Sequence, residues 1–501
     1  MTFRLNVLAS WIAHAVILLT GLILTPYILK TAGEHTYGGW IVLVAIAGYS
    51  RLLYLGFGET ICHYVAKHAA DEDWDQLNRV ASCTSAVYLA SGTVAFLAGC
   101  LIAWLAPGIE KFTSSPLPLR DIQIAMVLLG MNAAVSIAGS VFGGLLMGLQ
   151  RFDLERGVQI AITATRLILT VMFLKTDHGL IVLAGVFLFV STMEVALMWI
   201  FARRLLPGLR IRPSLIDRAT MKETTGFSLF TSTAVVSEQL VYATDSIVIG
   251  FKLGLLAVVP YSIAHRLCEM MRQPIHQVGI VSLPHASELH RNRQTEQLTR
   301  LVLGSMGLSV LLAGASLVGG WSFGDVLIRI WMPSDYRSVG ETHNLMLLLV
   351  AAQIIALPVG ILRKSLVGAG FVKLPSVLVF AGAIANLVVS LALVGPYGVY
   401  GVAYGTLIPI VLIDGLLLLP IGLKHLGISR RKAIVEIGLK NLLPLAALAV
   451  YCELIKRLNL PENWLSIALI AGCGALVTMA VRFGPAVVTN PRQVLRGGLE
   501  S

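Results

Sequence analysis

The chain consists mainly of long apolar segments that are separated by short polar loops. An α-helix needs about 20 predominantly apolar residues to cross the hydrocarbon core of a bilayer. Fourteen segments approach or exceed this length, at residues 5–29, 38–66, 78–105, 121–149, 157–174, 179–202, 225–250, 256–286, 299–321, 342–370, 375–394, 397–423, 434–455 and 463–482. The pattern therefore predicts an all-α polytopic membrane protein with about 14 transmembrane helices.

Composition supports a membrane protein and excludes several kinds of ligand and partner. Apolar residues make up 56% of the 501 positions and charged residues only 13%, whereas a typical soluble domain is about 25% charged. The net charge of +11 comes largely from loops between the apolar segments, so we expect no nucleic-acid partner. The six cysteines include no Cys-x-x-Cys pair, and neither a zinc site nor a disulfide framework is expected.

The distribution of basic residues predicts the orientation. Of the 38 Lys and Arg residues, 25 lie at the N-terminus, in the loops after even-numbered segments and in the C-terminal tail. The loops after odd-numbered segments hold nine, and four lie inside segments. Because basic residues favour the cytoplasmic side, both termini are predicted to be cytoplasmic. Arg363 and Lys364 are counted here with the loop that follows the tenth segment.

The longest loop divides the predicted helices into two groups of six. It carries six basic residues, Arg203, Arg204, Arg210, Arg212, Arg218 and Lys222. We therefore predict an N-terminal lobe at 1–205, a basic cytoplasmic linker at 206–224, a C-terminal lobe at 225–423, and two further helices with a tail at 424–501.

The two lobes are predicted to be parallel repeats, because six helices return the chain to the same side of the membrane. A constant offset in residue number, 220, pairs Gly148 with Gly368, Gly185 with Gly405, and Glu194 with Asp414. The acidic pair carries the most weight, since carboxylates are rare inside membrane helices.

Several short motifs, taken in order, resemble a known family. They are Leu-Gly-Phe-Gly-Glu at 55–59, Tyr-Val-Ala-Lys at 64–67, Leu-Leu-Met-Gly-Leu-Gln-Arg-Phe-Asp at 145–153, Pro-Gly-Leu-Arg-Ile-Arg at 207–212, Thr-Asp-Ser-Ile-Val-Ile-Gly at 244–250, and Trp-Met-Pro-Ser-Asp-Tyr at 331–336. Together they resemble the polysaccharide-transporter family of lipid-linked oligosaccharide (O-antigen type) flippases, part of the multidrug, oligosaccharidyl-lipid and polysaccharide exporter superfamily. This resemblance implies two six-helix lobes around a central cleft, two extra C-terminal helices, and transport by alternating access.

Ionisable residues lie within segments where lipid would otherwise be expected. The second segment carries Arg51, Glu59, His63 and Lys67 on one row, and the eighth carries His265, Arg266, Glu269, Arg272 and His276. One interpretation is a cationic stripe on each helix that lines a polar cavity. The alternative is that Glu59, His63 and Lys67 form a solvated face beyond the membrane and that Arg51 extends to the cytoplasmic interface.

Arg166 and Glu194 are predicted at similar depths on consecutive helices. They can form a structural ion pair, or Arg166 can face the cleft and bind phosphate. The offset of 220 places Asn386 where Arg166 would be. The second lobe therefore lacks the equivalent cation, and Asp414 is expected to need another partner or a proton.

The seventh segment carries Glu238, Tyr242 and Asp245 on one face, and His14 lies on the first segment. Together with Asp414, we consider Glu238 and Asp245 candidates for coupling transport to a proton or sodium ion. The plainer alternative is that they are partners for the cations of the eighth segment. No other cofactor and no metal site are expected.

The leading hypothesis is translocation of a polyprenyl-pyrophosphate-linked oligosaccharide across the bacterial cytoplasmic (inner) membrane, for surface polysaccharides such as lipopolysaccharide. Arginine suits a pyrophosphate because its planar guanidinium donates several hydrogen bonds at once. Arg51, Arg266 and Arg272 are the main candidates for substrate binding, with His14 and Arg166 next.

Two alternatives are a cation-coupled exporter of drugs or small molecules, with an acidic cavity, and a membrane-embedded glycan polymerase or ligase. Short external loops disfavour the enzyme, so no catalytic residue is predicted. The expected partners are the lipid-linked oligosaccharide, membrane lipids and polysaccharide-assembly proteins, and the protein is expected to be a monomer.

Overall fold

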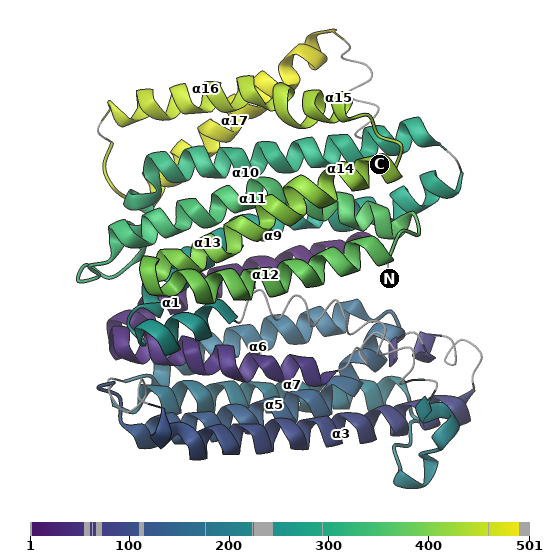
Figure 1. Cartoon of the computed structure of the whole chain (residues 1–501). Coiled ribbons are helices and arrows are strands. Elements are labelled where there is room, and N and C mark those ends of the chain that lie inside the picture. Colours follow the sequence, from purple (N-terminus) through teal and green to yellow (C-terminus); the bar gives the residue numbers. More distant parts are fainter. Residues whose placement is uncertain are drawn as a thin grey trace. The chain divides into compact units, whose positions relative to one another are not determined.

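The computed structural model of the chain describes residues 3–54, 61–62, 64–66, 73–109, 115–175, 177–222, 224, 244–292, 294–458 and 460–489, with side chains except at 3–14, 276–287, 290 and 485–489. The described residues form helices and no strand (Figure 1). The predicted all-α class is therefore confirmed.

The chain divides into two compact units, Met1–Val259 and Pro260–Ser501. Residues 244–259 therefore pack with the first unit, and the predicted division at the linker 206–224 stays a prediction. In that unit, a Cβ atom on Gly250 would lie 2.6 Å from a methyl group of Val42. The helix predicted to open the second lobe thus belongs, in its described part, to the first compact unit.

Eleven of the described helices are long and apolar enough to cross a membrane, which makes the protein a multi-pass membrane protein. The count of 14 stays a prediction. The segments predicted at 5–29 and 38–66 both lie in α1 (Phe3–Gly48) and the residues after it. The segment at 225–250 is described only from residue 244, and α9 (Val258–Arg291), which covers the one at 256–286, is not among the eleven.

A kink at Gly33 explains how α1 contains two predicted segments. Gly33 has φ 82° and ψ 165°, a left-handed conformation that glycine adopts without the steric penalty of a Cβ atom. Two helices therefore meet there in one element, which continues into the short helix η1 (Tyr49–Tyr54). The kink leaves Trp40 on the second of the two helices, and Arg51 follows in η1.

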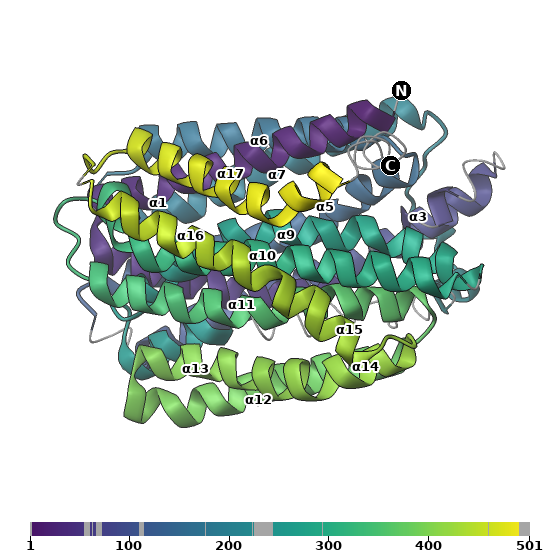
Figure 2. The same ribbon diagram turned by 90° about the horizontal axis from the view of Figure 1, so that it is seen from above.

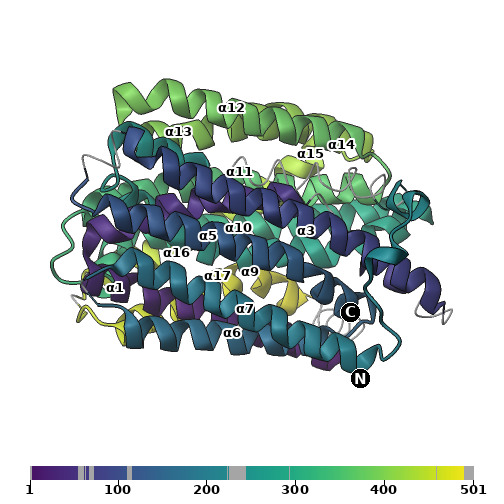
Figure 3. The same cartoon turned by 90° about the horizontal axis from the view of Figure 1, so that it is seen from below.

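The rest of the first unit is built around α3 (Trp74–Leu105), α5 (Leu119–Gly148), α6 (Phe152–Phe173) and α7 (Gly179–Leu205). Figures 1 and 3 show α3 lying along α5 and α5 along α7. Fully buried side chains such as Tyr88, Ile137 and Leu145 fill the α3–α5 interface. This bundle holds α6 and α7 in place, and the two helices position Arg166 and Glu194.

The described part of the predicted linker is held along the start of α3. The Asn78 side chain donates to the carbonyl of Gly208 at 3.1 Å and accepts from the backbone N–H of Arg210 at 2.7 Å. Ser82 accepts from the N–H of Arg212 at 3.1 Å. Further along, hydrogen bonds from Thr220 and the Ala219 N–H lower the pKa of the Asp217 carboxyl below its usual value.

The second unit repeats the pattern with α9, α10 (Thr295–Trp331), α11 (Val339–Gly368), α12 (Lys373–Tyr397) and α13 (Val399–Pro409). The chain continues from α13 through the π-helical segment η4 (Ile410–Leu418) into α14 (Leu419–His425). Buried residues of α10, α11 and α14 share one core.

The two C-terminal helices belong to the second unit. The chain forms α15 (Arg430–Ala433), η5 (Ile434–Leu439), α16 (Lys440–Lys456) and α17 (Trp464–Thr489). Figure 2 shows α16 along α10, and the Asn441 side chain donates to the Gly307 carbonyl of α10 at 2.7 Å. Both α16 and α17 contact α10, so α10 is the helix that carries this pair.

Helix boundaries repeat at the offset predicted from the sequence. Adding 220 to the bounds of α5 gives the bounds of α11, Val339–Gly368. The same addition takes α7 to the run from Val399 to His425, which is formed by α13, η4 and α14. The offset therefore assigns structurally equivalent positions in the two units, and charged residues can be compared position by position.

Candidate functional site

Arg166 lies on α6 against an aromatic pair. Its guanidinium carbon is 4.4 Å from the ring centroid of Phe187 on α7. Phe187 in turn meets Trp40 of α1 edge to face, with ring centroids 4.8 Å apart. A guanidinium over an aromatic face is held by the ring quadrupole and leaves its N–H groups directed outward in its plane. The aromatic pair therefore fixes Arg166 without using its hydrogen-bond donors.

Arg166 and Glu194 form no ion pair within 4.0 Å in the described part of the chain. Glu194 attracts Arg166 only at longer range, and the buried Nε of Arg166 has no hydrogen-bond partner among the described residues. Unmade hydrogen bonds at a buried charge are costly, and such groups call for an explanation such as a bound ligand. Arg166 thus keeps unsatisfied donors at a depth where few groups can satisfy them.

Arg51 lies in η1 with its side chain exposed on the first unit. Beside it, the Tyr49 hydroxyl is 2.5 Å from the Thr244 hydroxyl. The ring of Tyr54 packs against Tyr88 with centroids 6.0 Å apart. Neighbouring side chains thus fix η1 on the bundle, and Arg51 extends from it with no ion pair to a described residue.

On α9, Arg266 and Arg272 were both predicted to bind the substrate, but the structure gives them different partners. The Arg272 guanidinium binds both carboxylate oxygens of Glu269, with Nε–Oε1 at 2.8 Å and Nη2–Oε2 at 3.0 Å. Gln273 donates to the same carboxylate at 3.2 Å. The guanidinium donors of Arg272 that would bind a phosphate are therefore already bound to Glu269.

Arg266 is in a different state. Its side chain is half-buried, and its Nε is a buried atom with no hydrogen-bond partner among the described residues. The preceding residue, His265, stacks on Tyr261 with ring centroids 6.3 Å apart and planes at 22°. Arg266 therefore resembles Arg166 in having a buried Nε without a hydrogen-bond partner and no ion pair to a described residue.

The predicted need of Asp414 for a partner is met by a residue that sequence reasoning missed. Arg363 of α11 donates from Nη2 to Oδ1 of Asp414 at 2.9 Å. The amide of Asn386 bonds to the Gly405 carbonyl at 3.2 Å and the Thr406 hydroxyl at 3.1 Å. Arg363 lies within α11, so its assignment to a loop hid this pair.

The side chains of two candidate residues are not described. Glu238 lies outside the described residues, and His14 is described without its side chain. Asp245 is 5% exposed in the helix at 244–253. Where the structure describes the chain, no group of three His, Cys, Asp or Glu side chains is placed to hold a metal ion. The proposed coupling role of Glu238 and Asp245 therefore stays a prediction.

The described candidate cations fall into two sets. Arg51, Arg166 and Arg266 have no ion pair within the described part of the chain, whereas Arg272 is bound to Glu269. An unpaired guanidinium offers a planar, two-pronged donor that matches phosphate oxygens. The residues equipped to bind an anionic headgroup are therefore the three unpaired arginines.

Comparison with solved structures defines the class. The chain resembles the lipid II flippase MurJ in an inward closed conformation, at TM-score 0.72 and 14% identity, over 97% of this chain and 100% of that one. It also resembles a multidrug resistance MATE transporter of the MOP superfamily, at 0.67 and 15% identity, covering 83% and 94%. A MOP superfamily transporter from Pyrococcus furiosus matches at 0.53 and 14% identity, covering 84% and 93%. The protein therefore has the MOP superfamily fold.

The family follows from the sequence. The profile of the polysaccharide biosynthesis protein family matches residues 73–339, which is more than half of the chain. No match is found among curated protein sequences. The chain belongs to the polysaccharide biosynthesis protein family, and the predicted resemblance to the polysaccharide-transporter family of flippases is confirmed.

Proposed function

We propose that this protein translocates a polyprenyl-pyrophosphate-linked oligosaccharide across the bacterial cytoplasmic membrane by alternating access. The observation that carries the proposal is the pair of arginines, Arg166 and Arg266, one in each unit. Neither has an ion pair with a described residue, whereas Arg272 and Arg363 are paired with Glu269 and Asp414. The guanidinium of Arg166 also lies over the ring of Phe187. A pyrophosphate carries negative charge and acceptor oxygens that complement such groups.

Two further findings support a lipid-linked cargo. The family profile is that of polysaccharide biosynthesis proteins. The fold is shared with MurJ, which is named a lipid II flippase. The bilayer accommodates a polyprenyl tail, while the charged and hydroxyl-rich headgroup needs hydrogen-bonding protein groups to cross. The expected partners are this lipid, membrane lipids and polysaccharide-assembly proteins, with a monomeric transporter whose termini are cytoplasmic.

The paired residues have a supporting role in this proposal. Arg272 with Glu269 stabilises α9, and Arg363 with Asp414 joins α11 to η4. Asp414, Asp245 and Glu238 are the candidates for coupling to a proton or sodium ion. Binding of the cargo by Arg166 and Arg266 is independent of which ion supplies the energy.

The proposal is tested by measuring lipid-linked oligosaccharide in cells with and without the gene. Polyprenyl-linked sugars are extracted and their mass is determined. An external glycan-labelling reagent then reports which leaflet holds them. We expect a complete repeat unit to accumulate where the reagent has no access, and wild-type protein to restore labelling.

A matched set of variants ties the phenotype to the site. Arg166→Gln and Arg266→Gln are expected to leave protein levels unchanged and to fail in restoring labelling. Arg300→Gln, a change at an exposed surface arginine paired only with Glu296, serves as the control and is expected to restore it. An unchanged lipid-linked pool in the deletion strain would contradict the proposal and favour an exporter of small molecules.

A further inference from the structure

A cavity separate from these arginines lies in the second unit, between α10, α11, α16 and α17. It has a volume of about 570 Å³, within the range of pockets that bind small molecules. It is lined by the end of α10, the first turns of α11, the end of α16 and the beginning of α17. The predicted orientation puts these helix ends at the outer surface of the membrane.

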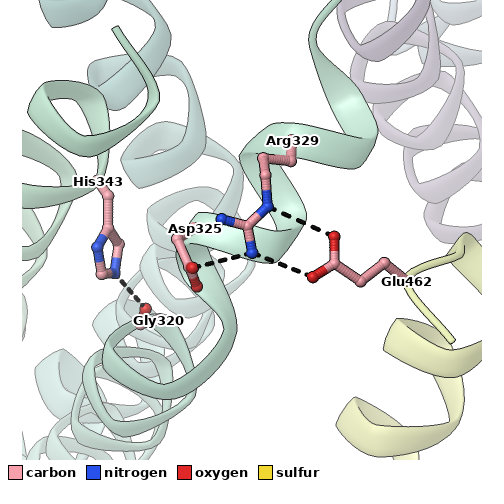
Figure 4. A network of polar contacts seen from close by, with 5 residues as sticks. All are labelled: Gly320, Asp325, Arg329, His343 and Glu462. Carbon is pink, nitrogen blue, oxygen red and sulfur yellow. Dashed lines mark hydrogen bonds and ion pairs between the residues drawn. The ribbon is translucent and has the colours of Figure 1, made fainter. Parts of the chain in front are cut away.

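An arginine joins the walls at the polar end of this cavity. Arg329 of α10 bonds to Asp325 on its own helix at 3.1 Å and to both oxygens of Glu462, at 3.1 and 3.4 Å (Figure 4). Glu462 lies in the loop between α16 and α17, so the loop is tied to α10. The wall is therefore preformed, and Asp325 keeps one carboxylate oxygen that this network does not use.

His343 on α11 also lines the cavity. Its Nε2 lies 2.9 Å from the Gly320 carbonyl (Figure 4). Because a carbonyl oxygen can only accept, Nε2 must carry the proton and donate it. His343 is thereby held against α10, and Asp325 is the acceptor that remains for a ligand.

A single unpaired ammonium group completes the polar lining. Lys456 at the end of α16 lines the cavity and has no ion pair with any described residue. Arg329 and Lys456 supply two positive charges, and Asp325 and Glu462 supply two negative charges, so the polar end is neutral overall. A ligand with one net negative charge gains little there, whereas one that carries both signs matches Lys456 and Asp325 together.

Away from these groups the lining becomes apolar. Leu347 of α11 and Ile467 and Ile470 of α17 form this part. Trp321, which is 69% exposed at the rim, is typical of residues at the level of lipid headgroups. The cavity thus passes from headgroup level, with charged groups, to membrane depth, with aliphatic groups.

We propose that this cavity binds a zwitterionic phospholipid with a primary ammonium group, of the phosphatidylethanolamine type. Lys456 binds the phosphate, Asp325 accepts a hydrogen bond from the ammonium group, and the acyl chain contacts Ile467 and Ile470. A glycan would find polar partners at only one end of the cavity. The bound lipid would fill the space between α10 and the C-terminal pair α16 and α17.

The test uses the full-length purified protein in detergent with three phospholipids of the same acyl chains. Native mass spectrometry and lipid-dependent thermal unfolding measure binding of phosphatidylethanolamine, phosphatidylcholine and phosphatidylglycerol. We expect phosphatidylethanolamine to bind about tenfold more tightly than phosphatidylglycerol, since one charged hydrogen bond is worth about this factor. Phosphatidylcholine should be intermediate, because its headgroup has both charges but no N–H donor.

Two variants and their neighbours locate the site. Lys456→Gln removes the phosphate partner, and Ile467→Trp fills the apolar part, so each should weaken phosphatidylethanolamine binding about tenfold. Arg457→Gln and Leu469→Trp change adjacent exposed positions outside the cavity lining and should bind as wild type. These controls separate loss of the site from loss of the fold.

Three outcomes would overturn the proposal. The first is equal or tighter binding of phosphatidylglycerol, and the second is unchanged binding in both cavity variants. The third is displacement of the lipid by soluble oligosaccharide released from the cell's lipid-linked pool, which would make the cavity a glycan site. None of these measurements depends on transport, so the result is independent of the function proposed above.

Discussion

The two units place charge differently on equivalent helices. In the first unit, the positions related by the repeat offset hold Gly143 on α5, Arg166 on α6 and Glu194 on α7. In the second unit they hold Arg363 on α11, Asn386 on α12 and Asp414 in η4. At these three positions each unit therefore has one cation and one carboxylate, but the cation lies on a different helix.

The helix on which the cation lies decides whether it forms an ion pair with the carboxylate. Arg363 reaches Asp414 directly at 2.9 Å, and Asn386 is left to join α12 to α13 through hydrogen bonds. A Cβ atom on Gly405 would clash with Ser390 of α12, so these two helices pack closely at this point. In the first unit, Arg166 rests on Phe187 instead of binding Glu194. The second unit thus pairs its cation with a carboxylate, whereas the first leaves it without an ion pair to a described residue, and we propose that this cation is kept for a ligand.

The largest expected effect follows from breaking the pair in the second unit. Arg363→Met leaves Asp414 without its partner, with 15% of that side chain exposed. Stranding a largely buried charge should destabilise the protein by about 3 kcal/mol. Thermal unfolding in detergent measures this effect. Adding Asp414→Leu should recover most of the loss, and a double variant as unstable as the single one would show that the pair is not the cause.

Removing the available cation of the first unit should affect transport instead. Arg166→Gln should lower the rate of translocation about 30-fold, as expected for loss of a charged hydrogen bond of about 2 kcal/mol. Its melting temperature should change little, because no direct ion pair is broken. Flipping measured per folded protein distinguishes the two effects. A variant that is unstable but transports normally would reverse the assignment of the two units.

The same contrast applies within α9. Arg266→Gln should reduce transport about tenfold, since Arg266 keeps a free donor, whereas Arg272→Gln should reduce it less and lower the melting temperature more. The Arg272–Glu269 pair is largely shielded, with 16% and 21% of the side chains exposed. Transport and melting are measured on both variants. Equal transport losses would show that the ion pair does not withhold Arg272 from the substrate.

The smallest effect tests whether the two arrangements are interchangeable. Gly143→Arg with Arg166→Asn transfers the pattern of the second unit to the first. A Cβ atom at Gly143 meets no atom within 4 Å, so the new side chain has room to extend toward Glu194. We expect a gain of about 1 kcal/mol in stability from the new pair and loss of transport. A variant that still transports would show that the position of the cation is unimportant.

Hydropathy was sufficient for the all-α, multi-pass class, because that class depends on the length and spacing of apolar segments. The repeat offset, inferred from Gly148, Glu194 and their counterparts, reappears in the bounds of α5 and α11. The kink at Gly33 was different, since a left-handed glycine joins two helices without changing the apolar pattern.

The pairing of charges depended on information that hydropathy does not contain. Arg363 was counted with the following loop because it lies near the end of the segment predicted at 342–370, although α11 continues to Gly368. The contact of Arg166 with Phe187 depends on the register between α6 and α7. A single sequence does not determine this register. The pair of Glu269 and Arg272 could have been predicted from the sequence, since residues three apart on a helix are neighbours.

The most direct test of the central claim is flipping in proteoliposomes. Lipid-linked oligosaccharide extracted from the deletion strain is reconstituted with purified wild-type protein, Arg166→Gln or the surface control Arg300→Gln. Access of an external labelling reagent then reports translocation. We predict flipping by the wild type and Arg300→Gln, and about 30-fold slower flipping by Arg166→Gln. No flipping by the wild type, or equal rates for all three proteins, would contradict the claim.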